Sequence, residues 1–257
     1  MMTAKKPYIA KMPDKQGYVL YNQAEHAIWQ TLITRQISIL ERRACAEFLR
    51  GLDALQITTT SIPQLPELSA ILHAHTQWKL EPVPALISTQ HFFTLLANRQ
   101  FPVATFIRRP ADLDYIEEPD IFHELFGHCP LLMHAPYADF VQAYGRLSLQ
   151  AEPHSQELLA RLFFYTIEIG LIQSPEGLRI YGGGILSSSN ESIYALESDI
   201  PLRVPFDVEH IVSHSFALDK LQKIYYVIED FKILYELLEV DLLGLMDKLK
   251  CAISSVN

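Results

Sequence analysis

The chain has few cysteines, no long apolar run and fewer basic than acidic residues. Cys45, Cys129 and Cys251 are widely spaced and odd in number, so they do not indicate the framework of a disulfide-stabilised domain. No apolar run approaches the ~20 residues of a membrane span, and the basic N-terminus leads into no hydrophobic signal segment. We therefore expect a protein of the reducing cytoplasm that has no membrane partner.

The charge balance is acidic. With 21 Lys and Arg against 30 Asp and Glu, the formal net charge is −9. Because phosphate binding needs a basic surface, we expect no nucleic-acid partner. The length of 257 residues and the hydrophobic content of 49% are enough for one substantial core. There is no internal repeat, low-complexity segment or long linker, so we predict an N-terminal arm over residues 1–20 and a single domain over residues 21–257.

Helical periodicity dominates the chain. Asn22 and Glu25 form a capping-box pattern, and apolar residues spaced mostly by four then predict one long helix to about Gly51. Residues 101–109 and 224–228 are strand-like, whereas the two prolines within residues 81–84 predict irregular structure. The predicted fold class is mainly α with a few short β-strands. Further helices are predicted to begin at Pro66, Ser88, Pro136, Ser155 and Asn190, with both serines as N-caps, and a final helix from about Phe231 to Lys250.

One stretch, residues 118–130 with the sequence EPDIFHELFGHCP, raises a metal hypothesis, because neutral imidazole is the commonest metal ligand among side chains. Its histidines, His123 and His128, are five residues apart, whereas the zinc-peptidase motif spaces them by four. On a straight α-helix this spacing puts the two rings about 140° apart. The helix must therefore end or bend near Gly127, or contain a wider π-type turn. A third ligand must come from elsewhere in the chain.

Glu168 is the candidate third ligand. It lies within the apolar run of residues 162–172, where a carboxylate is costly to bury unless it is paired or binds a metal. Two histidines and one carboxylate that leave open coordination positions form the facial triad of non-haem Fe(II) oxygenases. From the residues alone two alternatives stay open. Glu168 can lie on an exposed helix face, or the histidines can belong to a zinc-dependent hydrolase with Glu124 as general base.

The run over residues 118–130 resembles the signature of the pterin-dependent aromatic amino acid hydroxylases. The likeness covers roughly residues 18–230 and implies the single-domain catalytic fold of that family. The chain is similar to the compact bacterial members that hydroxylate phenylalanine. It is not expected to contain the regulatory domain and the tetramerisation helix of the animal enzymes. Further blocks agree in order and position: residues 62–65, 107–108, 165–168, 181–188 and 225–227.

The resemblance implies that His123, His128 and Glu168 hold Fe(II) and form the catalytic centre. It further implies a tetrahydropterin cofactor, such as tetrahydrobiopterin, with O2 as co-substrate and the conversion of L-phenylalanine to L-tyrosine as the reaction. The residues implied at the pterin are Phe92, Glu124, Ile87, Thr89, Ala85 and Phe163. Those implied at the amino acid substrate are Arg108, Asp120, Phe164, Ile169, Gly184 and Ser187.

Individual roles follow from the same resemblance. Phe92 matches the aromatic residue on which the pterin ring stacks, although by itself it would be interpreted as ordinary core. Glu124 matches an acid that accepts a hydrogen bond or helps proton transfer near the pterin; the alternative is a structural carboxylate that holds a ligand in place. Arg108 matches the residue that pairs bidentately with the substrate carboxylate, and Asp120 an acid that orients it. The resemblance gives Cys129 no role.

The sequence also departs from the family pattern. Phe164 stands where phenylalanine and tyrosine hydroxylases usually have Trp. The same change from Trp to Phe is seen in tryptophan hydroxylases. Ile169 and Phe163 replace a usual Phe and Tyr, and Pro102 replaces a histidine of the animal enzymes. We expect phenylalanine as the substrate, with tryptophan or another aromatic amino acid as the alternative. Further alternatives are the zinc-dependent hydrolase and a non-catalytic amino-acid-binding protein, and the protein is expected to be a monomer or a homodimer.

Overall fold

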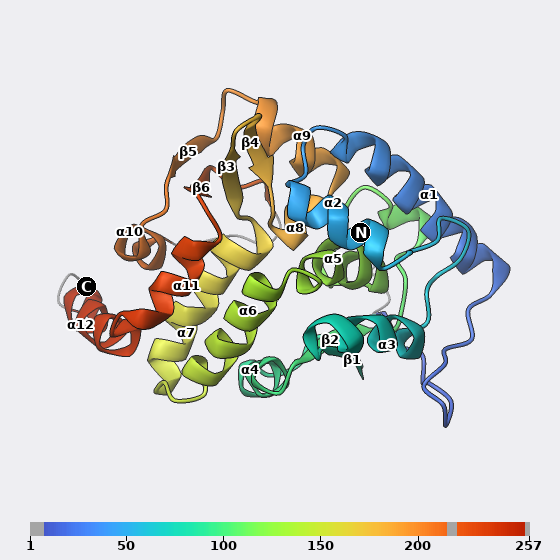
Figure 1. Ribbon diagram of the computed structural model, residues 1–257, viewed down its shortest axis with the longest axis horizontal. Coiled ribbons are helices and arrows are strands. Elements are labelled where there is room, and N and C mark those ends of the chain that lie inside the picture. The colour runs from blue at the N-terminus through green and yellow to red at the C-terminus, as the bar shows by residue number, and fades with distance from the viewer. Residues whose placement is uncertain (1–7, 215–219, 255–257) are drawn as a thin grey trace, which may run out of the picture.

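The computed structural model describes residues 8–214 and 220–254. Helices form most of it, with two small sheets, which confirms the mainly α fold class (Figure 1). The helices are α1 (Gln23–Leu40), α2 (Ala46–Ala54), α3 (Leu65–Thr76), α4 (Thr89–Ala97), α5 (Cys129–Leu132), α6 (Ala135–Ser148), α7 (Pro153–Phe163), α8 (Gly183–Leu186), α9 (Ser189–Glu197), α10 (Val208–Ser213), α11 (Lys232–Glu239) and α12 (Leu242–Ser254). The strands are β1 (Lys79–Val83), β2 (Gln100–Ala104), β3 (Leu171–Ser174), β4 (Gly177–Ile180), β5 (Leu202–Pro205) and β6 (Ile224–Ile228).

The two sheets lie on opposite sides of the central helices α5, α6 and α7 (Figure 1). The larger sheet has the strand order β4-β3-β6-β5, with β3 antiparallel to β4 and parallel to β6. The smaller sheet pairs β1 and β2 in parallel. The termini of the described chain lie far apart, with α1 and α12 at opposite ends of the molecule. Within the described ranges, every helix is too short or too polar to cross a membrane.

The long N-terminal helix is in fact two helices, so the prediction that it reaches Gly51 is wrong. The capping box of Asn22 is confirmed, with the Glu25 N–H bonded to the Asn22 side chain. The helix stops because Arg42 has a left-handed backbone, with φ 63°. The chain then pairs with the end of β4, where the Cys45 N–H donates to the Ile180 carbonyl at 2.9 Å. This tertiary pairing overrides the helical periodicity.

Residues 81–83 of the proline-rich segment predicted as irregular form the end of β1, which is a second correction, whereas Pro84 lies just beyond the strand. Pro82 lies opposite Val103, and Glu81 lies opposite Pro102 on β2. Both strands of a two-stranded sheet are edge strands, where proline is tolerated because only alternate N–H groups face the partner. Conversely, β2 ends at Ala104, so the predicted strand over residues 101–109 is too long.

Two helix predictions in the C-terminal half are also wrong. Ser155 is not an N-cap: α7 begins at Pro153, and the buried Ser155 hydroxyl donates to Asp247 of α12 at 2.8 Å. The final helix breaks between α11 and α12, where Asp241 accepts a hydrogen bond from the Gly244 N–H at 2.9 Å. Residues 8–22 contain no helix or strand, and residues 1–7 of the predicted arm lie outside the described residues.

Candidate active site

Two π-helical turns carry the three candidate metal ligands. The first, η2 (His123–His128), has the wide i→i+5 hydrogen bond from the Cys129 N–H to the Glu124 carbonyl. In such a turn residues five apart lie nearly above one another, so both imidazoles emerge on one face. The π-type turn considered from the spacing is therefore the conformation adopted. A straight α-helix would have separated the two rings.

The second π turn, η3 (Phe164–Glu168), continues directly from α7 and was not predicted. Its wide hydrogen bond joins the Ile169 N–H to the Phe164 carbonyl at 3.0 Å. Glu168 is its last residue, and the turn directs the carboxylate toward the two histidines. Glu168 Oε2 lies 3.3 Å from His128 Nε2 and 3.7 Å from His123 Nε2. The exposed-face alternative for Glu168 is therefore wrong.

The distances between these three side chains suit a shared metal ion. His123 Nε2 and His128 Nε2 are 3.1 Å apart, and the ligand atoms of all three residues lie within 4.8 Å of one another. Two ligand atoms that each lie about 2.1 Å from one ion are roughly 3.0 Å apart at a right angle and roughly 3.4 Å apart in a tetrahedron. The trio can thus occupy one side of an ion, leaving the other coordination positions open.

Hydrogen bonding fixes which nitrogen of His123 is available. Its Nδ1 lies 2.9 Å from the Ser187 hydroxyl, which itself donates to the Gly183 carbonyl at 3.0 Å. A hydroxyl has one proton, so Ser187 accepts from His123, and we assign the His123 proton to Nδ1. The lone pair of Nε2 then points toward His128 and Glu168. Partners of this kind orient metal-binding histidines in many metalloproteins.

The protonation of the trio also fits a cation. Burial, and then the neighbouring His128, lower the pKa of His123 to about 4. Burial raises the pKa of Glu168, but the two histidines outweigh it and lower that pKa to about 2. At neutral pH this gives a neutral imidazole beside an ionised carboxylate. Electron pairs held this close repel one another unless a cation lies between them.

Glycines let α8 approach the histidines closely. A Cβ on Gly183 would lie 2.4 Å from the His128 ring, and a Cβ on Gly127 would lie 2.5 Å from the Gly183 carbonyl oxygen. The ring of Phe101 covers another side of His128, with ring centroids 5.1 Å apart. Any larger residue at position 183 would displace the His128 ring from the trio.

A cavity of about 220 Å³ opens beside the metal trio and contains all the residues expected at the pterin. Phe92 and Phe163 meet edge to face, with centroids 5.2 Å apart. Burial, and then the charges of Glu168 and Asp120, raise the pKa of Glu124 well above its usual range. The raised pKa favours the protonated carboxyl, which can donate a hydrogen bond into this cavity. The expected residues that line it are Ala85, Ile87, Thr89, Phe92, Glu124 and Phe163.

An adjoining cavity of about 470 Å³ contains five of the six residues expected at the amino acid substrate. It shares the metal ligands His123 and Glu168 with the smaller cavity, together with the rings of Phe92 and Phe163, so these side chains form a common wall. Asp120 is the exception, because it is fully buried behind Arg108. The expected residues that line this cavity are Arg108, Phe164, Ile169, Gly184 and Ser187.

Arg108 and Asp120 form a bidentate ion pair. Arg108 Nε and Nη2 donate to the two carboxylate oxygens at 2.9 and 2.8 Å, and the Arg108 backbone N–H donates to Oδ2 at 2.9 Å. Burial opposes the charge of Asp120, but Arg108 outweighs it, so the pKa of Asp120 is lowered. The guanidinium is thus held by one edge. Among the described residues, its Nη1 has no hydrogen-bond partner, which leaves the other edge for an anion in the cavity.

Comparison with known proteins places this site in a family. The family model described as biopterin-dependent aromatic amino acid hydroxylase matches residues 2–240. The chain belongs to this family. It is 48% identical to a phenylalanine-4-hydroxylase of Pseudomonas aeruginosa, over 93% of this chain and 91% of that one.

Solved structures agree. A phenylalanine hydroxylase from Legionella pneumophila matches with a TM-score of 0.91 and 48% identity, over 94% of this chain and 96% of that one. The phenylalanine hydroxylase of Chromobacterium violaceum with bound Fe(III) matches with a TM-score of 0.88 and 44% identity, over 93% and 90% of the two chains. The resemblance inferred from residues 118–130 is confirmed, and this membership argues against a zinc-dependent hydrolase.

Sequence reasoning missed several residues of this hydroxylase that line the amino acid cavity, among them Ile116, Glu191 and Gln222. Glu191 accepts a hydrogen bond from the Tyr225 hydroxyl at 2.7 Å, which joins α9 to β6. No local pattern identifies these side chains, because they come from segments far apart in the sequence. For these side chains, the sequence indicated only that a helix begins next to Glu191, which is the start of α9.

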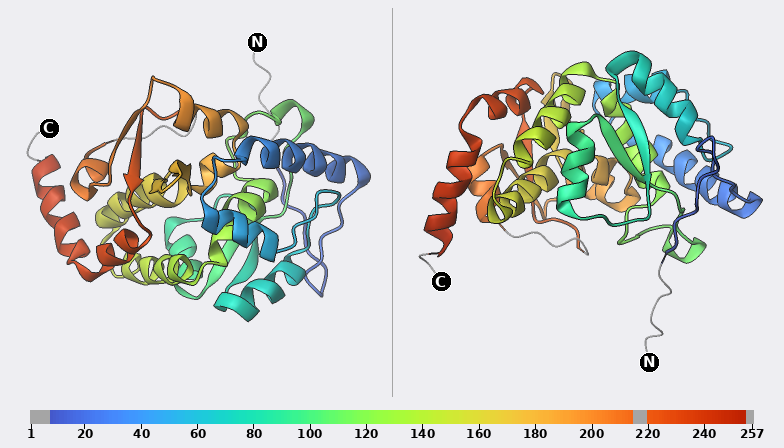
Figure 2. Two further views of the ribbon diagram at one scale, coloured as in Figure 1. Left: turned by 45° about the horizontal axis from the view of Figure 1, so that its top comes forward. Right: turned by 90° about the horizontal axis from the view of Figure 1, so that it is seen from below.

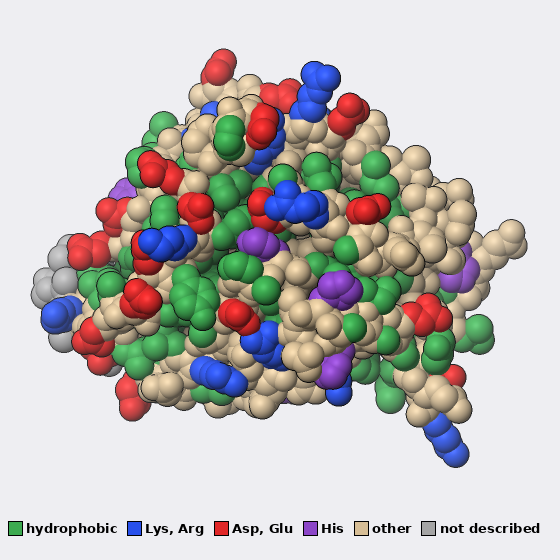
Figure 3. Space-filling view, viewed as in Figure 1, with side chains coloured by type: hydrophobic (Ala, Val, Ile, Leu, Met, Phe, Trp, Pro, Cys, Tyr) green, Lys and Arg blue, Asp and Glu red, His purple; other side chains and the backbone are tan. Residues whose placement is uncertain are grey.

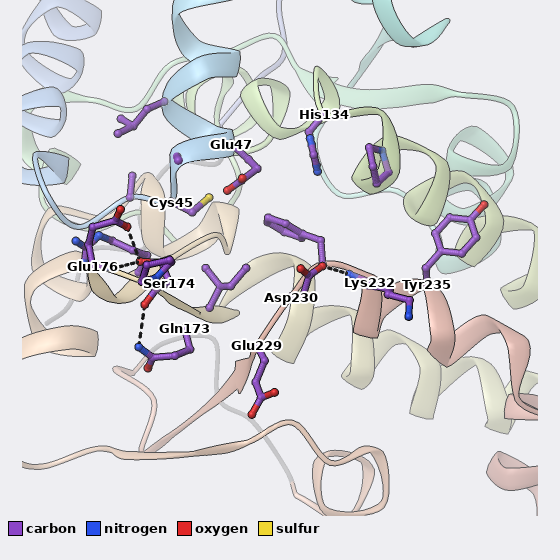
Figure 4. A pocket seen from close by; sticks show the side chains of 18 of the residues that line it. Cys45, Glu47, His134, Gln173, Ser174, Glu176, Glu229, Asp230, Lys232 and Tyr235 are labelled. Carbon is purple, nitrogen blue, oxygen red and sulfur yellow. Dashed lines mark hydrogen bonds between the residues drawn. The ribbon is translucent and has the colours of Figure 1, made fainter.

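A further cavity of about 1080 Å³ lies apart from the metal trio. Figure 4 shows Cys45 and Glu47 on one side and Asp230, Lys232 and Tyr235 on the other. None of the trio lines it.

Acidic and basic side chains are interspersed over the face of the molecule shown in Figure 3, and they form no continuous basic patch there.

Proposed function

We propose that this protein is a phenylalanine 4-monooxygenase, which converts L-phenylalanine to L-tyrosine with O2 and a tetrahydropterin. One observation carries the proposal: the cavity lined by Arg108 is also lined by His123 and Glu168, two of the three residues of the metal trio. A carboxylate-binding cation and a metal site thus face one space. The named relatives from Pseudomonas and Legionella support phenylalanine as the substrate.

We assign Fe(II) to the trio, because two neutral imidazoles and one carboxylate with open positions are the donor set of non-haem iron oxygenases. The iron-bound relative from Chromobacterium supports this assignment. When bound, iron and reduced pterin supply the activation of O2, chemistry that side chains cannot perform. The role of the three ligands is to hold the metal on one side and leave the other side open.

The chain's own residues orient the amino acid. Arg108 binds the substrate carboxylate through its free edge, while Asp120 fixes the guanidinium plane and compensates its charge. The substrate ring is then directed between Phe164 and Ile169, toward the trio. Burial of these walls keeps water from the reacting ring. Ser187 assists indirectly by holding the His123 ring in place.

On the other side of the trio, Phe92 offers a flat apolar surface for the pterin ring. Glu124 takes part in a hydrogen bond or a proton transfer at the pterin. Burial and two nearby carboxylates raise its pKa, which favours the protonated carboxyl as a donor. Ala85, Ile87 and Thr89 form the adjoining loop.

We further propose that residues 21–257 form the catalytic domain and residues 1–20 the arm, that the protein acts as a monomer or homodimer, and that it works in a reducing cytoplasm. The free, buried thiols of Cys45 and Cys129 support a reducing compartment. Sedimentation analysis across a range of protein concentrations tests the oligomeric state.

The activity is tested by product analysis. Iron-loaded protein with a reduced pterin is supplied with Phe, Tyr and Trp in competition, and each hydroxylated product is quantified. We expect tyrosine as the main product, and no turnover after iron removal by a chelator until iron is restored. Preferential hydroxylation of Trp would support the alternative substrate, which the smaller aromatic surface at Phe164 and Ile169 favours. Turnover by the iron-free protein would refute the proposal.

A further inference from the structure

The N-terminal arm crosses the segment that carries Arg108. In both views of Figure 2 the start of the described arm lies beside the green segment that follows β2 (Figure 2). The ring of Tyr8 stacks on Phe106, with centroids 4.7 Å apart and planes inclined by 14°. On the far side of Arg108, the Arg109 guanidinium carbon lies 4.3 Å from the centroid of the Tyr8 ring. One side chain of the arm thus touches Phe106 before Arg108 and Arg109 after it.

The Tyr8 hydroxyl adds two polar contacts to the same segment. It accepts a hydrogen bond from the Arg109 backbone N–H at 3.2 Å and donates one to the carboxylate of Asp112. Asp112 is only 4% exposed, so the acceptor of this bond is shielded from water. Through its ring and its hydroxyl, Tyr8 thus contacts the segment both before and after Arg108, from residue 106 to residue 112.

The rest of the arm is fastened to the beginning of this segment. The Thr105 hydroxyl donates to the Lys11 carbonyl at 2.7 Å, and the Tyr21 hydroxyl donates to the Thr105 carbonyl at 3.0 Å. Lys11 in turn pairs with Glu25 of α1. The arm therefore connects the first helix to the segment that carries Arg108.

These contacts matter because β2 ends at Ala104, so no sheet ladder holds the following residues. The backbone of the segment is held by the Ile121 N–H, which donates to the Phe106 carbonyl at 2.8 Å, by Asp120 and by the arm. A loop with few ladder bonds is mobile unless other groups order it. A displacement of the guanidinium by about 1 Å can cost up to roughly 100-fold in rate.

We propose that Tyr8 is a positioning residue for amino acid binding. It acts through the segment from Phe106 to Asp112 and keeps the free edge of Arg108 in register with the substrate carboxylate. This proposal rests on the proposed function. It assigns a part of amino acid recognition to the N-terminal arm, which lines neither cavity of the site.

The test compares steady-state kinetics of the full-length, iron-loaded protein and three variants. Tyr8→Ala removes the ring and the hydroxyl; Tyr8→Phe keeps the stacking on Phe106 and loses only the hydroxyl. Tyr18→Ala is the matched control, because Tyr18 lies in the same arm with its side chain 41% exposed. For each protein, KM is measured separately for phenylalanine and for the pterin, together with kcat and iron content.

We expect Tyr8→Ala to raise KM for phenylalanine on the order of tenfold, with kcat, KM for the pterin and iron content close to those of the wild type. Tyr8→Phe should give a smaller rise of roughly threefold, because the stacked ring is retained. Tyr18→Ala should behave like the wild type. A rise in KM for phenylalanine alone distinguishes a positioning role from a general loss of structure. A general loss of structure would change both KM values and the iron content together.

The inference is overturned if both Tyr8 variants keep the wild-type KM for phenylalanine, or if KM for the pterin rises by the same factor. If Tyr8→Ala does not fold, Tyr8→Phe decides, and a wild-type KM in that variant contradicts the proposal. A wild-type protein that makes no tyrosine would instead refute the proposed function, which the same assay shows before any variant is compared.

Discussion

The two cavities beside the metal trio differ in how they can hold a ligand. The larger one presents the buried ion pair of Arg108 and Asp120, with Ser187 and Glu191 nearby. The smaller one is mostly apolar, with Phe92, Phe163 and Glu124, whose pKa is raised by burial. A charged amino acid needs a fixed countercharge, because burying an unpaired carboxylate is costly. A flat ring system needs mainly a flat apolar surface.

The difference predicts that the two binding functions can be disturbed separately at residues that line one cavity alone. Both cavities share the wall formed by the metal ligands His123 and Glu168, and they also share the rings of Phe92 and Phe163. Changes in the shared wall should abolish the reaction. Changes on one side should move one KM and leave the other near its wild-type value. A variant that moved both KM values equally would contradict the separation.

The largest effect is expected for Glu168→Ala in the shared wall. Loss of one of three metal ligands should remove most bound iron and lower kcat by roughly three orders of magnitude or more, since metal and activity depend on the complete trio. Iron content by metal analysis and tyrosine formation are the two measurements. Cys129→Ala is the matched control, because Cys129 is buried beside His128 but only donates to the Glu124 carbonyl. Full iron content in Glu168→Ala would disprove the third-ligand assignment.

The next effect is expected for Arg108→Lys on the amino acid side. A lysine ammonium cannot donate to Asp120 and to the substrate carboxylate with the same planar geometry. We expect KM for phenylalanine to rise roughly 10- to 100-fold, with KM for the pterin nearly unchanged. The exposed Arg146→Lys on α6 serves as control and should match the wild type. An unchanged KM for phenylalanine would mean that another cation binds the carboxylate.

A smaller effect is expected for Phe92→Leu on the pterin side. Leucine keeps apolar area but loses the flat ring face, whose contribution to stacking is about 1 kcal/mol. KM for the pterin should rise roughly fivefold, and KM for phenylalanine by a smaller factor, because Phe92 also lines the amino acid cavity. Phe140→Leu is the control for core damage, because Phe140 is buried within α6. Phe140→Leu should lower thermal stability without changing either KM. A rise in KM for phenylalanine alone in Phe92→Leu would mean that the amino acid, and not the pterin, binds in the smaller cavity.

The smallest effect near neutrality concerns pH and the ion pair of Arg108 and Asp120. The pKa of Asp120 is lowered in the folded protein, so the unfolded chain binds more protons below about pH 4. The stability that Asp120 contributes is therefore fully present above that pH and is lost as pH falls further. We expect the difference in unfolding free energy between wild type and Asp120→Asn to be constant from pH 7 to 5 and to shrink below pH 4. Chemical denaturation at each pH measures it, and a difference that grew in acid would contradict the lowered pKa.

Local signals in the sequence were sufficient for several features. The capping box at Asn22, the N-cap at Ser88 and the β6 strand follow from neighbouring residues and are confirmed. The five-residue spacing of His123 and His128 restricted the backbone to a bend or a π turn. Such features depend on contacts within one or two turns of chain, so a local pattern contains the information that they need.

Other predictions from the sequence were wrong because contacts with distant segments determine the local structure. The break after Leu40 depends on pairing with Ile180, and the position of Ser155 in α7 depends on Asp247 of α12. The prolines near β1 suggested irregular structure, yet the partner strand β2 made an edge strand stable. In each case a hydrogen-bond partner far away in the sequence outweighed the local preference.

The same division applies to function. The sequence by itself determined the donor types of the metal trio, the family, and the residues expected on either side of the metal. Only the tertiary structure decided that η3 turns Glu168 toward the histidines, that Asp120 lies behind Arg108 with one guanidinium edge free, and that burial raises the pKa of Glu124. The reason is physical: residue identity sets which chemistry a side chain can perform, whereas burial and distance to other charges set its direction and protonation. Those quantities exist only once the chain has folded.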